Sequence, residues 1–219
     1  AEAVRGMCVI ALPYADVDLM ALTEGGLGAQ VHQALTEGPA ILAGLLRTSP
    51  IGGITWPAHG VLDEATLGEV AAAGGRAVVL SADAVTGGRS SGNGVVPVAG
   101  ANGSHLGLLA DPLLTKAASG PTRPNDSVPR TNRTTVSMTA AGSVGPLATQ
   151  DLIGALAFRL RSTTSGPAPL MIAPPHQWAA DGSGARALLE AVETMASSGM
   201  ATAHGLEAAV STEVPDDLR

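Results

Sequence analysis

Short apolar runs alternate along the chain with longer stretches in which apolar residues recur every three or four positions. This alternation is typical of βα units arranged around a mostly parallel sheet. We therefore expect an α/β fold, and more specifically a (β/α) barrel-like domain. The runs that predict strands are, in chain order, Met7–Leu12, Ile51–Trp56, Ala77–Leu80, Val95–Val98 and Leu170–Ala173.

Helical periodicity fills most of the intervals between these strands. Asp63 has the position of an N-cap and Pro146 that of a first helical residue. In the helix near the C-terminus, Leu188, Leu189 and Val192 are expected to face the core. The predicted helices are a stretch from about Asp16 to Leu46 that includes Gly25–Gly28, a helix from Asp63 to Gly74, and helices over Leu106–Ala118, Pro146–Arg161, Gly184–Ala196 and Leu206–Val210.

Two segments interrupt the regular pattern. Thr86–Gly94 is rich in Gly and Ser and is predicted to be a loop. Ser119–Asn132 contains three prolines and is predicted to be an exposed Pro-rich loop or a disordered segment. A length of 219 residues fits one large domain or two small ones, and we favour a single domain over residues 1–219.

Composition excludes some classes of function. The net charge of −7 repels phosphate, and the chain has only two Trp, one Tyr and one Phe on which bases could stack, so we expect no nucleic-acid partner. The longest apolar runs are far below the ~18 residues of a membrane span. The single cysteine, Cys8, lies in an apolar run and is predicted to be a buried free thiol.

The residues that follow the predicted strands carry most of the candidate chemistry. Ligands of parallel α/β folds bind at the carboxyl ends of strands, which we call the rim. Three of the four aromatic residues are among them. The candidate rim residues are Tyr14, Asp16 and Asp18 after the first strand, Trp56 and His59 after the second, Asp83 after the third, and His176 and Trp178 after the last.

Each candidate has a structural alternative. Asp16 and Asp18 could cap a helix, or one of them could pair with Asp83 as acid and base in glycoside hydrolysis. Trp56 could form a platform for a sugar ring or plug the end of the barrel. His59 and His176 each lack a second histidine at helical spacing, so we expect them in a ligand site without a metal or a cofactor.

Several common motifs are absent from the sequence. It has no P-loop and no Gly-x-Gly-x-x-Gly after a strand, which disfavours nucleotide enzymes. It also has no Gly-x-Ser-x-Gly after a strand, which disfavours a doubly wound serine hydrolase.

The chain resembles an uncharacterised family of large actinobacterial envelope proteins. The resemblance is carried by Ala11–Asp18, Thr55–Gly60 with Leu62–Asp63, Val78–Ser81 and Pro174–Trp178. Members of that family are exported, carry a C-terminal membrane anchor and are often encoded beside the MviN/MurJ-type lipid II flippase. Their central domain is similar to polysaccharide deacetylase and glycosidase (β/α) barrels. The sequence departs from active deacetylases because the Asp-Asp pair after the first strand and the His-x-x-x-His metal pair are missing.

The resemblance implies that the chain is a fragment of a longer protein, with the barrel incomplete before Met7. It implies an extracytoplasmic location in the cell envelope, with any membrane contact made by a segment outside this chain. We expect a non-catalytic domain that binds a cell-wall glycan such as peptidoglycan, or an envelope protein. The alternatives are a glycoside hydrolase-like or deacetylase-like enzyme that acts on cell-wall polysaccharide, and a purely structural module.

Overall fold

The computed structural model describes residues 4, 6–85, 94–100, 103–119, 146–162, 170–174, 176 and 182–211. Most of the Gly/Ser-rich segment Thr86–Gly94 lies outside these residues, as does Ser119–Asn132 except for Ser119. The chain forms two compact units. The first comprises Ala1–Ala110, Pro169–Met171 and His204–Arg219, and the second Asp111–Ala168 and Ile172–Ala203. The expectation of a single domain over the whole chain stays a prediction.

A four-stranded sheet forms the centre of the first unit. Its strands are β1 (Ile54–Thr55), β2 (Ala77–Ser81), β3 (Val95–Gly100) and β4 (Gly103–Ala110), in the order β1-β2-β4-β3. β1, β2 and β4 are parallel, and β3 is antiparallel to β4. The α/β class with mostly parallel strands is therefore confirmed. Among the described residues the sheet is open, with β1 and β3 at its edges, so a closed barrel is not confirmed.

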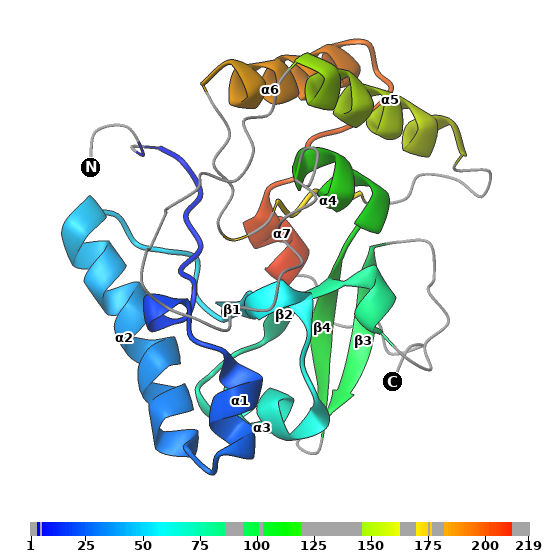
Figure 1. Ribbon diagram of the computed structural model, residues 1–219. Coiled ribbons are helices and arrows are strands. Elements are labelled where there is room, and N and C mark those ends of the chain that lie inside the picture. The colour runs from blue at the N-terminus through cyan, green and yellow to red at the C-terminus, as the bar shows by residue number, and fades with distance from the viewer. Residues whose placement is uncertain are drawn as a thin grey trace, which may run out of the picture. The chain divides into compact units, whose positions relative to one another are not determined.

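Three helices cover one face of this sheet. They are α1 (Leu19–Glu24), α2 (Gly28–Leu46) and α3 (Glu64–Ala72), and Figure 1 shows them gathered on one side of β2. The unit also contains α7 (Leu206–Ser211). The aliphatic core between helices and sheet consists of Leu19, Val31, Leu67, Val70, Val78, Leu80, Val96 and Leu109.

The described residues of the second unit form three helices, α4 (Pro112–Ser119), α5 (Pro146–Ser162) and α6 (Gly182–Ser197). Their core is formed by Leu114, Ala118, Leu152, Leu156 and Met195. None of the helices in the described part of the chain combines the length and the apolar composition that crossing a membrane requires.

The predicted first strand is wrong. Residues 8–12 form no strand, and Cys8 is exposed, whereas we expected it to be buried. One backbone hydrogen bond, from Ile51 N–H to the carbonyl of Val9 at 2.7 Å, ties this segment to the chain just before β1. Because β1 has only two residues and follows Gly52–Gly53, it offers almost no ladder with which a further strand could pair.

The predicted helix Leu106–Ala118 is also wrong over its first half. Leu106–Ala110 belongs to β4, and the helix begins only at Pro112. Of the strand predicted at Leu170–Ala173, a single parallel bridge between Met171 and Ala110 is present. The long helical stretch is divided at Gly25–Leu27 into α1 and α2.

The inward face predicted for α6 is wrong at two positions. Leu189 is 68% exposed and Val192 is 38% exposed, while Leu188 packs against the core of the second unit. Three helices bury only a narrow stripe of each other, so residues at the border of the apolar face of α6 remain in contact with solvent.

Candidate functional site

The β1 loop, which we define as Trp56–Gly60, turns sharply after the strand. Trp56 is half-buried and Pro57 is buried. The N–H of Gly60 donates to the carbonyl of Pro57 at 3.0 Å, and both His59 (φ 59°) and Gly60 (φ 66°) are left-handed. Histidine is one of the few residues other than glycine found in this region, at some cost in energy. The turn leaves the side chain of His59 exposed to solvent.

The segment after Leu12 forms the same kind of turn. The N–H of Asp16 donates to the carbonyl of Pro13 at 2.8 Å, and Ala15 (φ 56°) and Asp16 (φ 51°) are left-handed. Tyr14, at the start of this turn, is 49% exposed. In the described part of the chain, three of the four non-glycine residues with positive φ lie in these two turns. Strained backbone of this kind tends to be retained at functional sites.

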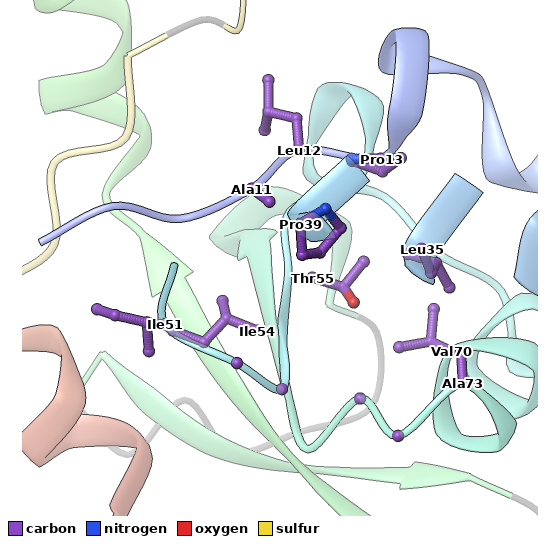
Figure 2. Close-up of a pocket in the computed structure, with 14 residues that line it drawn as sticks. Ala11, Leu12, Pro13, Leu35, Pro39, Ile51, Ile54, Thr55, Val70 and Ala73 are labelled. Carbon is purple, nitrogen blue, oxygen red and sulfur yellow. The ribbon is translucent and has the colours of Figure 1, made fainter. Parts of the chain in front are cut away.

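A small cavity connects the beginnings of the two turns. It has a volume of about 60 Å³, and its lining includes Leu12 and Pro13 from one segment and Thr55 from the other. Figure 2 shows Pro39 and Leu35 of α2 closing it together with Val70 of α3 and Ala73, the residue that follows α3. None of the described residues that line it has a titratable side chain, so these residues bring the two turns together without supplying chemistry of their own.

The β1 loop also rests on the end of β2. A Cβ atom added to Gly60 would lie 2.7 Å from the backbone nitrogen of Ser81, the last residue of β2. Ser81 leads into the β2 loop, which we define as Ala82–Val85, where Asp83 is exposed on a short 3₁₀ turn. The structure therefore holds the loop that carries His59 against the carboxyl end of β2, from which the loop that carries Asp83 continues.

A larger cavity adjoins the β2 loop, and we call it the α3 cavity. It has a volume of about 340 Å³ and is bounded by the first turn of α3, by β2 and the β2 loop, and by β3. Its polar lining side chains are Asp63 and Glu64, and the other lining residues are aliphatic or proline. Neither carboxylate was among the site residues that we predicted from the sequence, where Asp63 was recognised only as a cap.

Asp63 caps α3 as expected. Its Oδ1 accepts from the N–H of Thr66 at 2.8 Å. The Thr66 side chain and its N–H both favour the ionised carboxylate, which holds the pKa of Asp63 below its ordinary value of 3.8. Asp63 therefore adds a negative charge to the lining of the α3 cavity at neutral pH.

Asp18 also has a structural role. Its Oδ1 accepts from the N–H of Ala21 at 3.1 Å, so it is the N-cap of α1, which was one of the two alternatives left open by the sequence. Asp16 is exposed and lies within the turn that follows Pro13. Their assignment as catalytic candidates with Asp83 stays a prediction.

Two predicted residues are not tested by the structure. His176 is half-buried and belongs to the second unit, and Trp178 lies outside the described residues. Both stay predictions as ligand-binding residues.

The described residues do not fit a bound metal. Within that part of the chain, no three His, Cys, Asp or Glu side chains are grouped so that they could hold a metal ion. His59 and Asp83 offer one nitrogen and one carboxylate, whereas a catalytic zinc site has three protein ligands. We therefore assign no metal-dependent step to these residues.

Sequence reasoning overlooked Asp111, a carboxylate that directly follows β4. Its Oδ1 accepts from the N–H of Leu114 at 3.0 Å, and its Oδ2 lies 2.7 Å from Nε of Arg159. An Asp-Pro pair after an apolar run was the available signal, because it places an N-cap before a first helical proline. Both oxygens are engaged within the second unit, so Asp111 stabilises α4 and α5.

No family model matches the chain, and no curated protein matches it in sequence. Comparison with solved structures places the fold in a class, that of proteins with a polysaccharide deacetylase-like fold. The structure that shows this is the crystal structure of a putative polysaccharide deacetylase from Mycobacterium smegmatis, with a TM-score of 0.58 and 14% sequence identity. The match covers 91% of this chain and 59% of the mycobacterial chain, so this chain spans only part of that protein's length.

Proposed function

We propose that the chain is a carbohydrate-active domain that removes acyl groups from a cell-envelope polysaccharide. The observation that carries the proposal is the contact between Gly60 and Ser81, which holds the loop bearing His59 against the strand end that leads into the loop bearing Asp83. Ligands of open parallel α/β sheets bind at this end of the strands. The likeness in fold to a deacetylase supports the class of substrate, and the resemblance to exported envelope proteins supports an extracytoplasmic location.

The residues of the two loops have distinct roles in this proposal. His59 acts as a general base that takes a proton from the water attacking the acyl carbonyl, and it returns this proton to the sugar nitrogen or oxygen as the acyl bond breaks and the carboxylic acid leaves. Asp83 stabilises the imidazolium that forms, as a carboxylate beside a catalytic histidine does. Tyr14 and Trp56 supply the apolar surface against which a sugar ring packs. The pair needs no metal for these steps.

Acetate release from acetylated chitooligosaccharides and peptidoglycan fragments tests the proposal. His59→Ala and Asp83→Asn should lower the rate by about 100-fold or more, the usual contribution of a general base. The matched controls are His32→Ala and Asp151→Asn, which change exposed residues on α2 and α5 and should leave the rate unchanged. Equal rates in the wild type and in both loop variants would contradict the assignment.

Non-catalytic glycan binding is the second candidate function. It is favoured by the exposure of both His59 and Asp83 to solvent, since burial is one of the means by which enzymes adjust a general base to its task. Calorimetric binding of the same glycans without any acetate release would support this candidate over the first. If the glycans neither bind nor lose acetate, both candidates fail.

A further inference from the structure

The α3 cavity has a lining that suits a hydrocarbon chain. In the described part of the chain, its walls are made by six branched aliphatic side chains from α3 and the segment before it, from β2 and the β2 loop, and from β3, and no aromatic residue is among the lining. These side chains are Leu62, Leu67, Val78, Leu80, Val85 and Val98. A sugar would lose its hydrogen bonds with water on entering such a cavity and regain few, because aliphatic walls donate and accept none.

The size of the cavity agrees with this class of ligand. Small-molecule sites have volumes of about 300–1,000 Å³, and the α3 cavity, at about 340 Å³, lies at the lower end of this range. A single acyl or alkyl chain of medium length fits such a space, whereas a molecule with several chains or fused rings needs a larger one.

The acidic side chains that line the cavity restrict the head group that a bound hydrocarbon chain can carry. Asp63, the N-cap of α3, and Glu64, its first residue, are adjacent, and both line the cavity. Among the residues that the structure describes, no Lys, Arg or His lines it. Two carboxylates repel an anionic head group such as phosphate, sulfate or carboxylate, and attract a cationic one or accept hydrogen bonds from hydroxyl groups.

We infer that the α3 cavity binds one aliphatic chain that carries a cationic or uncharged, hydroxyl-bearing head group. The inference goes beyond the proposed function, because this ligand binds in the α3 cavity and is not cleaved there. It rests on two observations, the aliphatic lining from α3, β2 and β3 and the two carboxylates of Asp63 and Glu64.

Calorimetry with three single-chain amphiphiles below their micellar concentrations tests the inference. We expect decyltrimethylammonium and decyl maltoside to bind one to one, and decyl sulfate to bind about tenfold more weakly or not at all. Affinity should rise up to roughly fourfold for each added methylene until the cavity is filled. Equal binding of all three head groups, or no binding of any, would overturn the inference.

Substitutions locate the binding site. Ala84→Leu places a larger side chain in the lining and should abolish binding, whereas Ala65→Leu, on the exposed side of α3, should leave it intact. Ala99→Leu fills the cavity from β3 and replaces Ala84→Leu if that variant does not fold. Glu64→Gln should reduce the preference for the cation over the sulfate, and the exposed Glu24→Gln should not. Unchanged binding in a folded Ala84→Leu or Ala99→Leu variant would contradict the assigned location.

Discussion

Gly60 and Ser81 are in direct backbone contact, with only 2.7 Å between the position of a Cβ atom on Gly60 and the backbone nitrogen of Ser81. Through this contact the loop after β1 rests on the last residue of β2. The contact requires glycine for two reasons, the close approach and the left-handed φ of 66°. It fixes the position of His59, one residue earlier, relative to the β2 loop.

Gly60→Ala is therefore expected to destabilise the chain by about 2 kcal/mol or more, because the added methyl group meets the backbone of β2 in a left-handed conformation. Urea unfolding followed by circular dichroism measures the change. Gly68→Ala is the matched control, since a Cβ atom there meets nothing within 4 Å and the residue lies inside α3. The control should gain about 0.5–1 kcal/mol. Equal stabilities of the two variants would contradict the contact.

His59→Gly should have the opposite effect on stability. Glycine relieves the left-handed conformation of residue 59, so we expect a gain of about 0.5–1 kcal/mol in the free energy of unfolding. His32→Gly, in the middle of α2, should instead cost about 1 kcal/mol. A histidine kept where glycine is more stable is the pattern expected of a residue retained for function. A less stable His59→Gly variant would argue that the imidazole has a structural role.

The carboxylate of Asp63 should make stability depend on pH. At pH 7, Asp63→Ala should cost about 1 kcal/mol, the usual value of an N-cap. Because the pKa of Asp63 is lower in the folded chain than its ordinary value of 3.8, this contribution is complete above that value. It is lost as the pH falls through the folded pKa.

Urea unfolding of the wild type and of Asp63→Ala at pH 7 and at pH 3 measures this effect. The difference in stability between them should be smaller at pH 3. Asp83→Ala, which removes an exposed carboxylate outside any helix cap, serves as the control and should show little difference at either pH. A difference in stability between wild type and Asp63→Ala that is larger at pH 3 than at pH 7 would contradict the expected direction of the pH dependence.

The pair Asp111 and Arg159 should contribute to the stability of the second unit. The side chains are 14% and 34% exposed, and their geometry is that of an ion pair without an aligned hydrogen bond at Nε. We expect Arg159→Met to cost about 1 kcal/mol, less at high salt, because partial exposure screens the charges. The exposed Arg161→Met should change stability little. Thermal unfolding at low and high salt compares the two variants.

The elements that sequence reasoning predicted well are those with a single strong signal. Ala77–Leu80 is apolar at every position because both faces of β2 are buried, and Asp63 precedes a clear helical period. β4 was overlooked because Leu106, Leu109 and Leu114 also recur at helical spacing, and periodicity alone does not separate a buried strand from a helix. The boundary at Asp111-Pro112 would have separated them.

The sequence predicts only part of the candidate site. Strand ends indicated the loops of His59 and Asp83 because the carboxyl ends of parallel strands meet at one edge of a sheet. The contact of Gly60 with Ser81 and the left-handed φ of His59 depend on backbone geometry that composition does not reveal. The α3 cavity could not be predicted because its lining residues come from α3, β2 and β3, which are separate in sequence. Its two acidic residues, Asp63 and Glu64, have the pattern of an ordinary helix N-terminus.

The most direct test of the central claim is to map where an acetylated glycan binds. In ¹H–¹⁵N NMR spectra of the chain titrated with acetylated chitooligosaccharide, we expect the largest shifts at the Trp56 indole, at His59 and Gly60, and at Asp83. These shifts should be absent from the His59→Gly, Asp83→Asn double variant if the two loops form the binding site. Shifts confined to residues away from both loops, or no shifts at any glycan concentration, would contradict the account.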